Sequence, residues 1–349
     1  MSDVRIAILG AGLIGREHIR LVAAHPSATL AAVVDPDPAA RAEAARLGVP
    51  WYDALEPMLD AVRPEGVIVA LPNRLHVPAA LACVARRIPV LVEKPLSDTV
   101  ASALELVEAG ERAGVPVLAG HQRRHSPDIL AARRAVIDGE IGDLVAISGV
   151  WLVRKHDSYF DAEWRRRKGG GPLLINLIHD IDCFRFICGE IESVQAITSN
   201  RQRGFAVEDT TAVLMRFENG ALGTFLLSDT VPSPYTWDGA SGQALYFPHQ
   251  PEDCYVIGGR KASLAVPSMH LWQPVWPDGD WRDANTRRRL QADRSSCYVN
   301  QLENFVGVIR GAAAPHVTAR EGALSLAAIL AVERAAEEGR SVRVAEMLA

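Results

Sequence analysis

The chain has little net charge, no paired cysteines and no long apolar run, and each shortage excludes a class of protein. Its five cysteines form no close pair, which excludes a disulfide framework and favours a reducing compartment. The net charge of -5 is too small, and of the wrong sign, to favour nucleic acid or an anionic membrane surface. The longest apolar stretch outside the N-terminus, 322–332, falls short of the ~20 residues that span a bilayer. We therefore expect a cytoplasmic protein without nucleic-acid or membrane partners.

Lysine is scarce as well. Of the 37 basic residues only Lys94, Lys155, Lys168 and Lys261 are lysines, so arginine fills most positions that need only positive charge. Apolar residues, by contrast, make up 48% of the chain, which excludes general disorder and provides for packed cores. A length of 349 residues is typical of about two domains.

The first 121 residues alternate short apolar runs with stretches that carry apolar residues at helical spacing. The runs are continuous rather than alternating, as in strands that are buried on both faces. We expect strands at 4–9, 29–34, 66–71, 89–92 and 115–119, and helices at 14–24, 38–47, 77–85 and 98–113. Asp98 is the expected N-cap of the last of these helices. This repetition predicts a doubly wound parallel sheet over residues 1–121.

The pattern changes in residues 122–349, where runs of strands are flanked by helices. Helices are expected at 128–137, 172–187, 298–309 and 321–338. Strands are expected at 144–153, 194–198, 211–217, 221–227, 254–257 and 263–266. Glu218-Asn219-Gly220 joins two of these strands, and an Asn-Gly turn between apolar runs is a strong hairpin signal. We predict an α+β domain with an open, mainly antiparallel sheet.

A glycine motif follows the first expected strand and opens the first expected helix. Gly10, Gly12 and Gly15 are spaced as GxGxxG, with Leu13 and Ile14 inside the motif. The first glycine permits a tight turn, the second a close approach to a pyrophosphate, and the third close packing of helix on strand. A flexible loop that binds nothing could have the same glycine spacing. The position of the motif between a strand and a helix favours a dinucleotide site.

Asp35 stands 20 residues after Gly15, at the end of the second expected strand. A carboxylate there accepts hydrogen bonds from a ribose 2′-hydroxyl and repels a 2′-phosphate. At about 4 Å one unit-charge pair costs ~1 kcal/mol in water-like surroundings and ~4 kcal/mol at an effective dielectric constant of 20. The sequence therefore favours NAD over NADP, unless Asp35 only caps the following helix.

A series of motifs then gives the chain a family resemblance. Leu71-Pro72-Asn73 and His76 follow the third strand, Glu93-Lys94-Pro95 follows the fourth, and a 120–127 segment, GHQRRHSP, leads into the second half. Three glycines, 169–171, precede a helix that carries His179. In this order and over nearly the whole chain, the series resembles the Gfo/Idh/MocA oxidoreductases. The resemblance implies an N-terminal Rossmann domain, a C-terminal domain for substrate binding and oligomerisation, and hydride transfer between a sugar or polyol and NAD(P).

The resemblance also implies roles for individual residues. Lys94 would lie between cofactor and substrate, placed by an unusual peptide bond before Pro95, and His179 would be the active-site histidine. The implied cofactor contacts besides the glycine motif, Asp35 and Lys94 are Leu71, Pro72, Asn73, His76, Glu93, Gln122, Trp164 and Arg165. The expected substrate contacts are Asp182, Asn176, Arg165 and Tyr235, where Tyr235 belongs to a set of aromatic residues that either stack on a sugar or only pack.

One position departs from the family pattern. The family has an aspartate four residues before the histidine, whereas Ile175 stands there in this chain, followed by Asn176. An amide does not take up a proton as a carboxylate does. The family's set of lysine, aspartate and histidine is therefore incomplete here, and proton transfer must proceed without the aspartate.

Oxidation of an alcohol needs a base that titrates near neutral pH. Histidine does so unperturbed, at about 6.5, whereas lysine starts near 10.4. We therefore assign His179 as the acid–base group and Lys94 as the donor that stabilises the alkoxide-like oxygen. The reverse assignment stays open, as does a purely structural role for either side chain.

Two alternatives to a dehydrogenase remain at this stage. A catalyst that retains NAD would give no net redox change, and a dinucleotide-dependent sensor would not turn over at all. A metal site is not expected, because His121 and His125 have no third ligand at matching spacing. The open sheet predicts a homodimer or homotetramer, since a bare face would expose apolar side chains.

Overall fold

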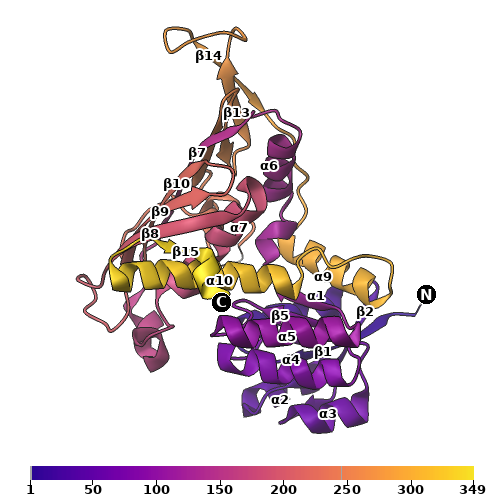
Figure 1. Cartoon of the computed structure of the whole chain (residues 1–349). Coiled ribbons are helices and arrows are strands. Elements are labelled where there is room, and N and C mark those ends of the chain that lie inside the picture. Colours follow the sequence, from indigo (N-terminus) through magenta and orange to yellow (C-terminus); the bar gives the residue numbers. More distant parts are fainter. Residues whose placement is uncertain (1, 245) are drawn as a thin grey trace. The chain divides into compact units, whose positions relative to one another are not determined.

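The computed structural model describes residues 2–244 and 246–349, which form two compact units (Figure 1). One unit joins the residues up to His125 with Cys297–Leu326, and the other joins Ser126–Ser296 with Ala327–Ala349. This division differs from the expected 1–121 and 122–349, because residues 297–326 belong to the first unit. Helix α9 (Cys297–Ile309) explains the difference, since its Phe305 and Ile309 side chains pack against Gly66 of the parallel sheet.

The first unit contains a six-stranded parallel sheet in the order β3-β2-β1-β4-β5-β6. Its strands are β1 (Val4–Leu9), β2 (Ala28–Val34), β3 (Trp51–Tyr52), β4 (Gly66–Val69), β5 (Val90–Glu93) and β6 (Val117–Gly120). Strands β4, β5 and β6 are buried throughout, as continuous apolar runs predict. The doubly wound parallel sheet is confirmed, although β3 was not predicted.

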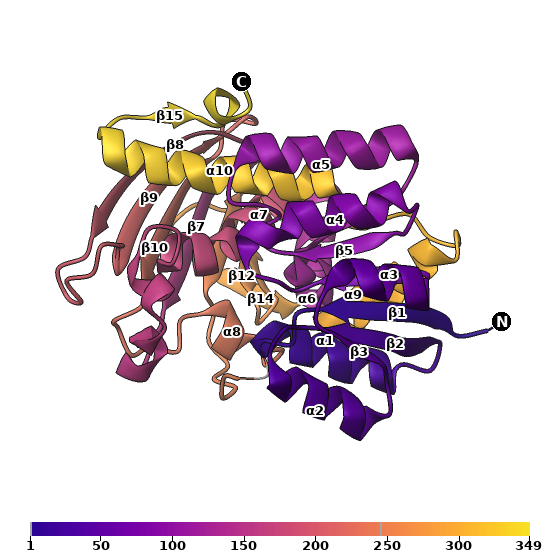
Figure 2. The ribbon, with the colours of Figure 1, turned by 90° about the horizontal axis from the view of Figure 1, so that it is seen from below.

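Helices connect these strands. They are α1 (Leu13–Ala24), α2 (Pro38–Leu47), α3 (Leu55–Val62), α4 (His76–Ala85) and α5 (Val100–Ala113), with short 3₁₀ turns η1 (Asn73–Leu75) and η2 (Gln122–His125). Figure 2 shows α4 and α5 side by side. The predicted Asp98 cap is wrong, because the Thr99 side chain accepts the N–H of Ser102 and caps α5. Helix α3 was not predicted.

The second unit contains a nine-stranded sheet in the order β14-β13-β12-β11-β7-β10-β9-β8-β15. Its strands are β7 (Leu144–Leu152), β8 (Ile191–Ser199), β9 (Thr210–Phe217), β10 (Leu222–Ser228), β11 (Tyr255–Gly259), β12 (Ser263–Val266), β13 (His270–Pro274), β14 (Asn285–Arg289) and β15 (Val342–Arg343). Only β7 and β10 run parallel among the strand pairs of this sheet that the structure describes, so it is mainly antiparallel. The β9–β10 hairpin is confirmed, with Gly220 at φ +88°.

The remaining elements are α6 (Pro127–Ile137), η3 (Asp157–Asp161), η4 (Glu163–Arg166), the π-helical turn η5 (Leu173–Leu177), α7 (Ile178–Cys188), α8 (Trp237–Ala240), α10 (Ala319–Glu338) and η6 (Val344–Met347). Helix α7 packs on one face of the sheet, where the Phe184 ring meets the rings of Phe225 and Tyr255 at 5.8 and 5.1 Å. The described helices include none that is both long and apolar enough to cross a membrane.

Candidate functional site

The glycine motif forms the turn between β1 and α1 in the first unit. Gly10 has φ +92°, and a Cβ there would lie 2.3 Å from the carbonyl oxygen of Ala70. A Cβ on Gly15 would lie 2.0 Å from the carbonyl oxygen of Gly10, so only glycine fits at either position. A Cβ on Gly12 would have no atom within 4 Å, and no side chain caps α1. The turn thus leaves open space at the positive end of a helix, which suits a diphosphate.

Asp35 follows β2 and holds this turn in place. Its Oδ2 accepts the backbone N–H of Ala11 at 2.7 Å, and its Oδ1 accepts the N–H of Asp37 at 2.8 Å. Asp35 is not the cap of α2, because the Asp37 side chain accepts the N–H of Ala39 and takes that role. Each Asp35 oxygen keeps a further lone pair, so the carboxylate can still accept a hydroxyl hydrogen.

The turn after β4 contains Leu71, Pro72 and Asn73 and leads into α4. His76, at the start of that helix, has Nδ1 at 2.8 Å from the carbonyl oxygen of Pro95 and Nε2 at 2.7 Å from that of Leu71. Burial lowers the pKa of His76, although both carbonyl contacts oppose the shift. His76 therefore ties the β4 turn to the β5 turn, and its predicted contact with a cofactor stays a prediction.

The Glu93-Lys94-Pro95 segment ends β5. His18 on α1 donates from Nε2 to Glu93 Oε1 at 2.8 Å, and both side chains are buried. Burial by itself raises the pKa of Glu93, but the His18 hydrogen bond and the nearby charges bring it below its ordinary value. A Cβ on Gly120 of β6 would lie 2.9 Å from Glu93 Cα, so this strand pair also requires glycine. The buried carboxylate and the neighbouring strand fix the backbone on which Lys94 stands.

Lys94 is half-buried at this strand end, and its peptide bond to Pro95 is cis, as the resemblance implies. Gln122, after β6, is buried and donates from Nε2 to the Tyr298 hydroxyl of α9 at 3.3 Å. His18 was missed by the sequence reasoning, because nothing in the sequence links it to Glu93, 75 residues away.

These turns share one edge of the parallel sheet. They follow β1, β4, β5 and β6, which are neighbours in the sheet, and all four strands end at this edge. The strand order reverses between β1 and β4, and open α/β sheets bind ligands outside the carboxyl ends of the strands at such a switch point. The residues present therefore fit a dinucleotide.

In the second unit, the π-helical turn η5 runs directly into α7. His179 and Asp182 lie on α7 and are buried, and neighbouring Asp180 accepts a short hydrogen bond from the Tyr255 hydroxyl. Asn176 lies in η5, where its Oδ1 accepts a hydrogen bond from Lys155 Nζ at 2.8 Å. Single π-helical turns are frequent at functional sites. The structure therefore places Asn176 less than one turn of the same continuous helix before His179.

Lys155 was not among the predicted site residues. It follows β7, and its Nζ lies 3.7 Å from Asp229 Oδ2 and 4.7 Å from the centre of the Tyr159 ring. Burial lowers the pKa of Lys155 to about 8; Asp229 opposes the shift, and Arg203 and Arg165 add to it. The scarcity of lysine was the only sequence signal that singled this residue out.

The three remaining predicted residues lie in loops of the second unit. Trp164 and Arg165 belong to η4, where Trp164 is exposed and Arg165 stacks on Tyr159 with its Cζ 3.8 Å from the ring centre. Arg165 Nη1 also donates to the carbonyl oxygen of Tyr159 at 2.6 Å. Tyr235 is 45% exposed, and its carbonyl oxygen accepts the N–H of Leu152 at the end of β7. Tyr235 and Lys155 thus both stand near the carboxyl end of β7.

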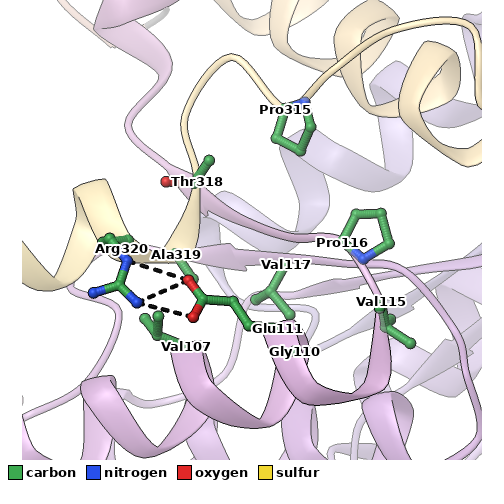
Figure 3. A pocket seen from close by; sticks show the side chains of 11 residues that line it. Val107, Gly110, Glu111, Val115, Pro116, Val117, Pro315, Thr318, Ala319 and Arg320 are labelled. Atoms are coloured by element: carbon green, nitrogen blue, oxygen red, sulfur yellow. Dashed lines mark hydrogen bonds and ion pairs between the residues drawn. The ribbon is translucent and has the colours of Figure 1, made fainter.

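A separate pocket of about 420 Å³ lies in the first unit (Figure 3). Valine and proline side chains and glycine backbone line it, together with Arg320 and Glu111, which form an ion pair with an N–O distance of 2.8 Å. It contains none of the predicted site residues. Among the described residues, no group of three or more His, Cys, Asp or Glu side chains could hold a metal ion.

Comparison with known proteins decides the family. Residues 4–121 match the model described as the oxidoreductase family NAD-binding Rossmann fold, and residues 129–265 match the GFO/IDH/MocA C-terminal domain. The chain belongs to the Gfo/Idh/MocA oxidoreductase family. Residues 4–121 are therefore its NAD-binding Rossmann domain, in agreement with the glycine turn and Asp35.

Individual relatives match all or part of the chain. The rhizopine catabolism protein MocA of Rhizobium meliloti is 28% identical over 98% of this chain and 100% of its own length. An inositol 2-dehydrogenase of an Arthrobacter species is 35% identical over 63% of this chain and 66% of its own length.

A solved structure of the WlbA dehydrogenase of Bordetella pertussis, in complex with NADH and UDP-GlcNAcA, covers 98% of this chain and 98% of its own. It has a TM-score of 0.79 and 24% identity. An oxidoreductase from Agrobacterium radiobacter covers 99% of this chain and 100% of its own, with a TM-score of 0.84 and 17% identity. These two similarities show a shared fold.

Proposed function

We propose that this family member is an NAD-dependent dehydrogenase that oxidises a CH–OH group of a sugar, a polyol or a related cyclic alcohol. The observation that carries the proposal is the placement of Lys94 at the same edge of the parallel sheet as the glycine turn, on a segment fixed by the buried His18–Glu93 pair. A lysine on so constrained a backbone suits a group that must meet a reacting oxygen. Two relatives support a polyol-like substrate by their names: MocA, which matches nearly the whole chain, and an inositol 2-dehydrogenase, which matches part of it.

In this proposal NAD, when bound, supplies the ring that accepts the hydride. Gly10, Gly12 and Gly15 would accommodate its diphosphate with Leu13 and Ile14, and Asp35 would accept the ribose hydroxyls. The proposed nicotinamide contacts are Leu71, Pro72, Asn73, Glu93, Lys94, Gln122, Trp164 and Arg165. His76 would act by positioning the Lys94 segment.

Two side chains would divide the chemistry on the substrate hydroxyl. His179 takes the O–H proton, because imidazole titrates near neutral pH, and Lys94 donates a hydrogen bond to the oxygen as negative charge develops. Asp182, Asn176, Arg165 and Tyr235 are the proposed substrate contacts. A screen of NAD reduction across cyclic polyols, aldoses and sugar acids tests the proposal, and NADH formation with at least one of these compounds is the expected result.

Replacing Asp35 by asparagine should relax the preference for NAD. The amide keeps an acceptor for the Ala11 N–H but removes the charge that repels a 2′-phosphate, so affinity for NADP relative to NAD should rise at least about fivefold. Fluorescence titration of both cofactors measures the ratio. Asp37→Asn is the matched control, because Asp37 caps α2. Equal affinity of the wild type for both cofactors would refute the assignment.

We further propose a homodimer or homotetramer formed through the open face of the second sheet. Register places Ile197, Ala212, Leu214, Leu222, Leu226 and Val256 on this face, and all of them are exposed. Light scattering at micromolar concentration should report at least a dimer. The double change Leu214→Lys and Leu226→Lys should produce monomers, whereas Ile137→Lys, at an exposed position on α6, should not. A wild-type mass of 37.8 kDa would contradict this proposal.

The proposal also places the enzyme in the cytoplasm. All five cysteines are buried and form no disulfide bond among the described residues, which suits a compartment that keeps thiols reduced.

A further inference from the structure

Charged side chains gather around Lys155 in the second unit, and their charges do not balance. Lys155 and Arg203 share Asp229: Arg203 Nε donates to Oδ1 at 2.8 Å, and Lys155 Nζ lies 3.7 Å from Oδ2. Exposed fractions of the three side chains are only 10%, 11% and 1%, in the order Lys155, Arg203, Asp229. Two largely buried cations therefore face one fully buried carboxylate.

The charged side chains that surround these three residues do not remove the excess of positive charge. Arg165 adds a third cation, stacked on the Tyr159 ring that Lys155 also approaches, and its Nε is buried with no hydrogen-bond partner among the described residues. Besides Asp229, the cluster contains one more carboxyl group that is mostly buried, that of Glu208. Burial raises the pKa of Glu208, and its Oε1 accepts the N–H of Leu173. Asp157, which lies 3.7 Å from Arg203, is 96% exposed. Even with Glu208 ionised, three cations face two buried carboxylates.

Asn176 presents a further donor in this cluster. A lysine amine can only donate when charged, so the contact at 2.8 Å assigns Asn176 Oδ1 to Lys155 and leaves Nδ2 as a donor. The Nδ2 group has no partner among the described residues. The η5 turn, Leu173–Leu177, contains no acidic residue that could accept it.

Most of the remaining hydrogen-bonding capacity of the cluster consists of donors. Asp229 Oδ2 is a buried acceptor without a hydrogen-bond partner among the described residues, and it lies 3.7 Å from Lys155 Nζ. Lys155 has one hydrogen-bond acceptor, Asn176 Oδ1, for its three N–H groups, and Asn176 Nδ2 and Arg165 Nε add further donors. A site that combines donors with excess buried positive charge is complementary to an anion with several acceptor oxygens. Asn176 lies less than a turn before His179, so this anion would belong to the molecule on which His179 acts.

We propose that Lys155, with Asn176, binds a carboxylate of the substrate, and that the enzyme therefore oxidises a sugar acid rather than a neutral sugar. The inference rests on the proposed dehydrogenase function and narrows its substrate class. Lys155 is the specificity-determining residue in this account, and Asn176 is the link that places the carboxylate beside His179.

The experiment compares acids with their neutral counterparts. D-glucuronate, D-galacturonate and D-gluconate are paired with D-glucose, D-galactose and D-glucitol, and D-glucose 6-phosphate distinguishes a phosphate from a carboxylate. Calorimetry with NADH present measures binding, and NAD reduction measures KM and kcat. The wild type should bind at least one acid about 10- to 100-fold more tightly than its neutral partner, the range of a charge-assisted contact.

Lys155→Met removes the charge at nearly constant length and should abolish this preference, so that binding of the acid falls by more than binding of its neutral partner. Asp229 keeps its 2.8 Å bond to Arg203, so the variant should fold, which thermal unfolding checks. Lys261→Met is the matched control, since Lys261 is an exposed lysine of the same unit. An equal loss for acid and neutral partner would make Lys155 merely structural and overturn the proposal.

The wild type provides an independent test through pH. An anion binds the protonated amine, and the pKa of Lys155 is about 8, so the ratio of KM for acid to KM for neutral partner should rise above about pH 8. The other charged groups facing Lys155 are Asp229, Arg203, Arg165 and Glu208, with Tyr159 as the neighbouring phenol. A flat ratio overturns the proposal.

Two further results also decide it. If no acid binds better than its neutral partner, or if the phosphate binds best, the inference fails while NADH formation from neutral sugars keeps the proposed function. If acids bind through Lys155 but no compound reduces NAD, the carboxylate site stands and the dehydrogenase function fails.

Discussion

Replacing His179 by alanine is expected to lower kcat by about 100-fold or more, with NAD binding nearly unchanged. A positioned acid–base group contributes roughly 10²–10⁴-fold to a rate, and alanine cannot take up the hydroxyl proton. His179 lies on α7 in the second unit, outside the glycine turn and Asp35, so cofactor affinity should stay within about twofold. Steady-state kinetics and a fluorescence titration of NADH measure the two quantities.

Lys94→Ala provides the comparison that assigns the roles. It should cost at least as much in kcat, and Lys94→Arg should not restore the rate, because a guanidinium is bulkier and does not deprotonate. His270→Ala, on β13, is a control that should leave kcat unchanged. If His179→Ala keeps full activity while Lys94→Ala abolishes it, the assignment of the base is wrong and Lys94 transfers the proton.

Gly15→Ala is expected to lower both the unfolding free energy of the first unit and kcat/KM for NAD. The added Cβ would stand 2.0 Å from the carbonyl oxygen of Gly10, and backbone atoms cannot move away as a flexible side chain could. We expect a loss of about 3 kcal/mol of unfolding free energy, the upper end of overpacking costs. A displacement of about 1 Å in the turn would lower kcat/KM for NAD about 100-fold. Thermal unfolding and initial rates measure both effects.

Gly12→Ala separates the two effects. Its Cβ would have no protein atom within 4 Å, so the free energy of unfolding should fall by at most about 1 kcal/mol, the cost of alanine at an N-cap. If the open space at Gly12 holds a diphosphate, the variant should still bind NAD at least tenfold more weakly. Unchanged NAD affinity in Gly12→Ala would contradict this location of the cofactor.

The features that could be predicted from sequence are those encoded within short segments. Continuous apolar runs identified the strands of the Rossmann sheet except β3, and Asn219-Gly220 identified the β9–β10 hairpin. The glycine motif and Asp35 are local signals too, because one strand–turn–helix unit and the next strand contain them all. For these features the side chains that decide the structure are close together in the chain.

The features that could not be predicted depend on contacts between distant residues. His18 meets Glu93 across 75 residues, and Lys155 meets Asn176 and Asp229 across 21 and 74 residues. The helical spacing of apolar residues predicts α9. It does not show that Phe305 of this helix packs against Gly66, which lies far away in the sequence on β4. Strand β14 is fully exposed and contains three arginines, so it has no apolar alternation that would mark it.

Hydrogen transfer from substrate to cofactor can be followed directly with an isotope. The best compound of the substrate screen, deuterated at the carbon that is oxidised, is incubated with the enzyme and NAD, and the free NADH is analysed by mass spectrometry. We predict one deuterium in the released NADH and one molecule of oxidised product, a ketone or a lactone, for each NADH. Substrate conversion without released, labelled NADH would contradict the assignment as a dehydrogenase.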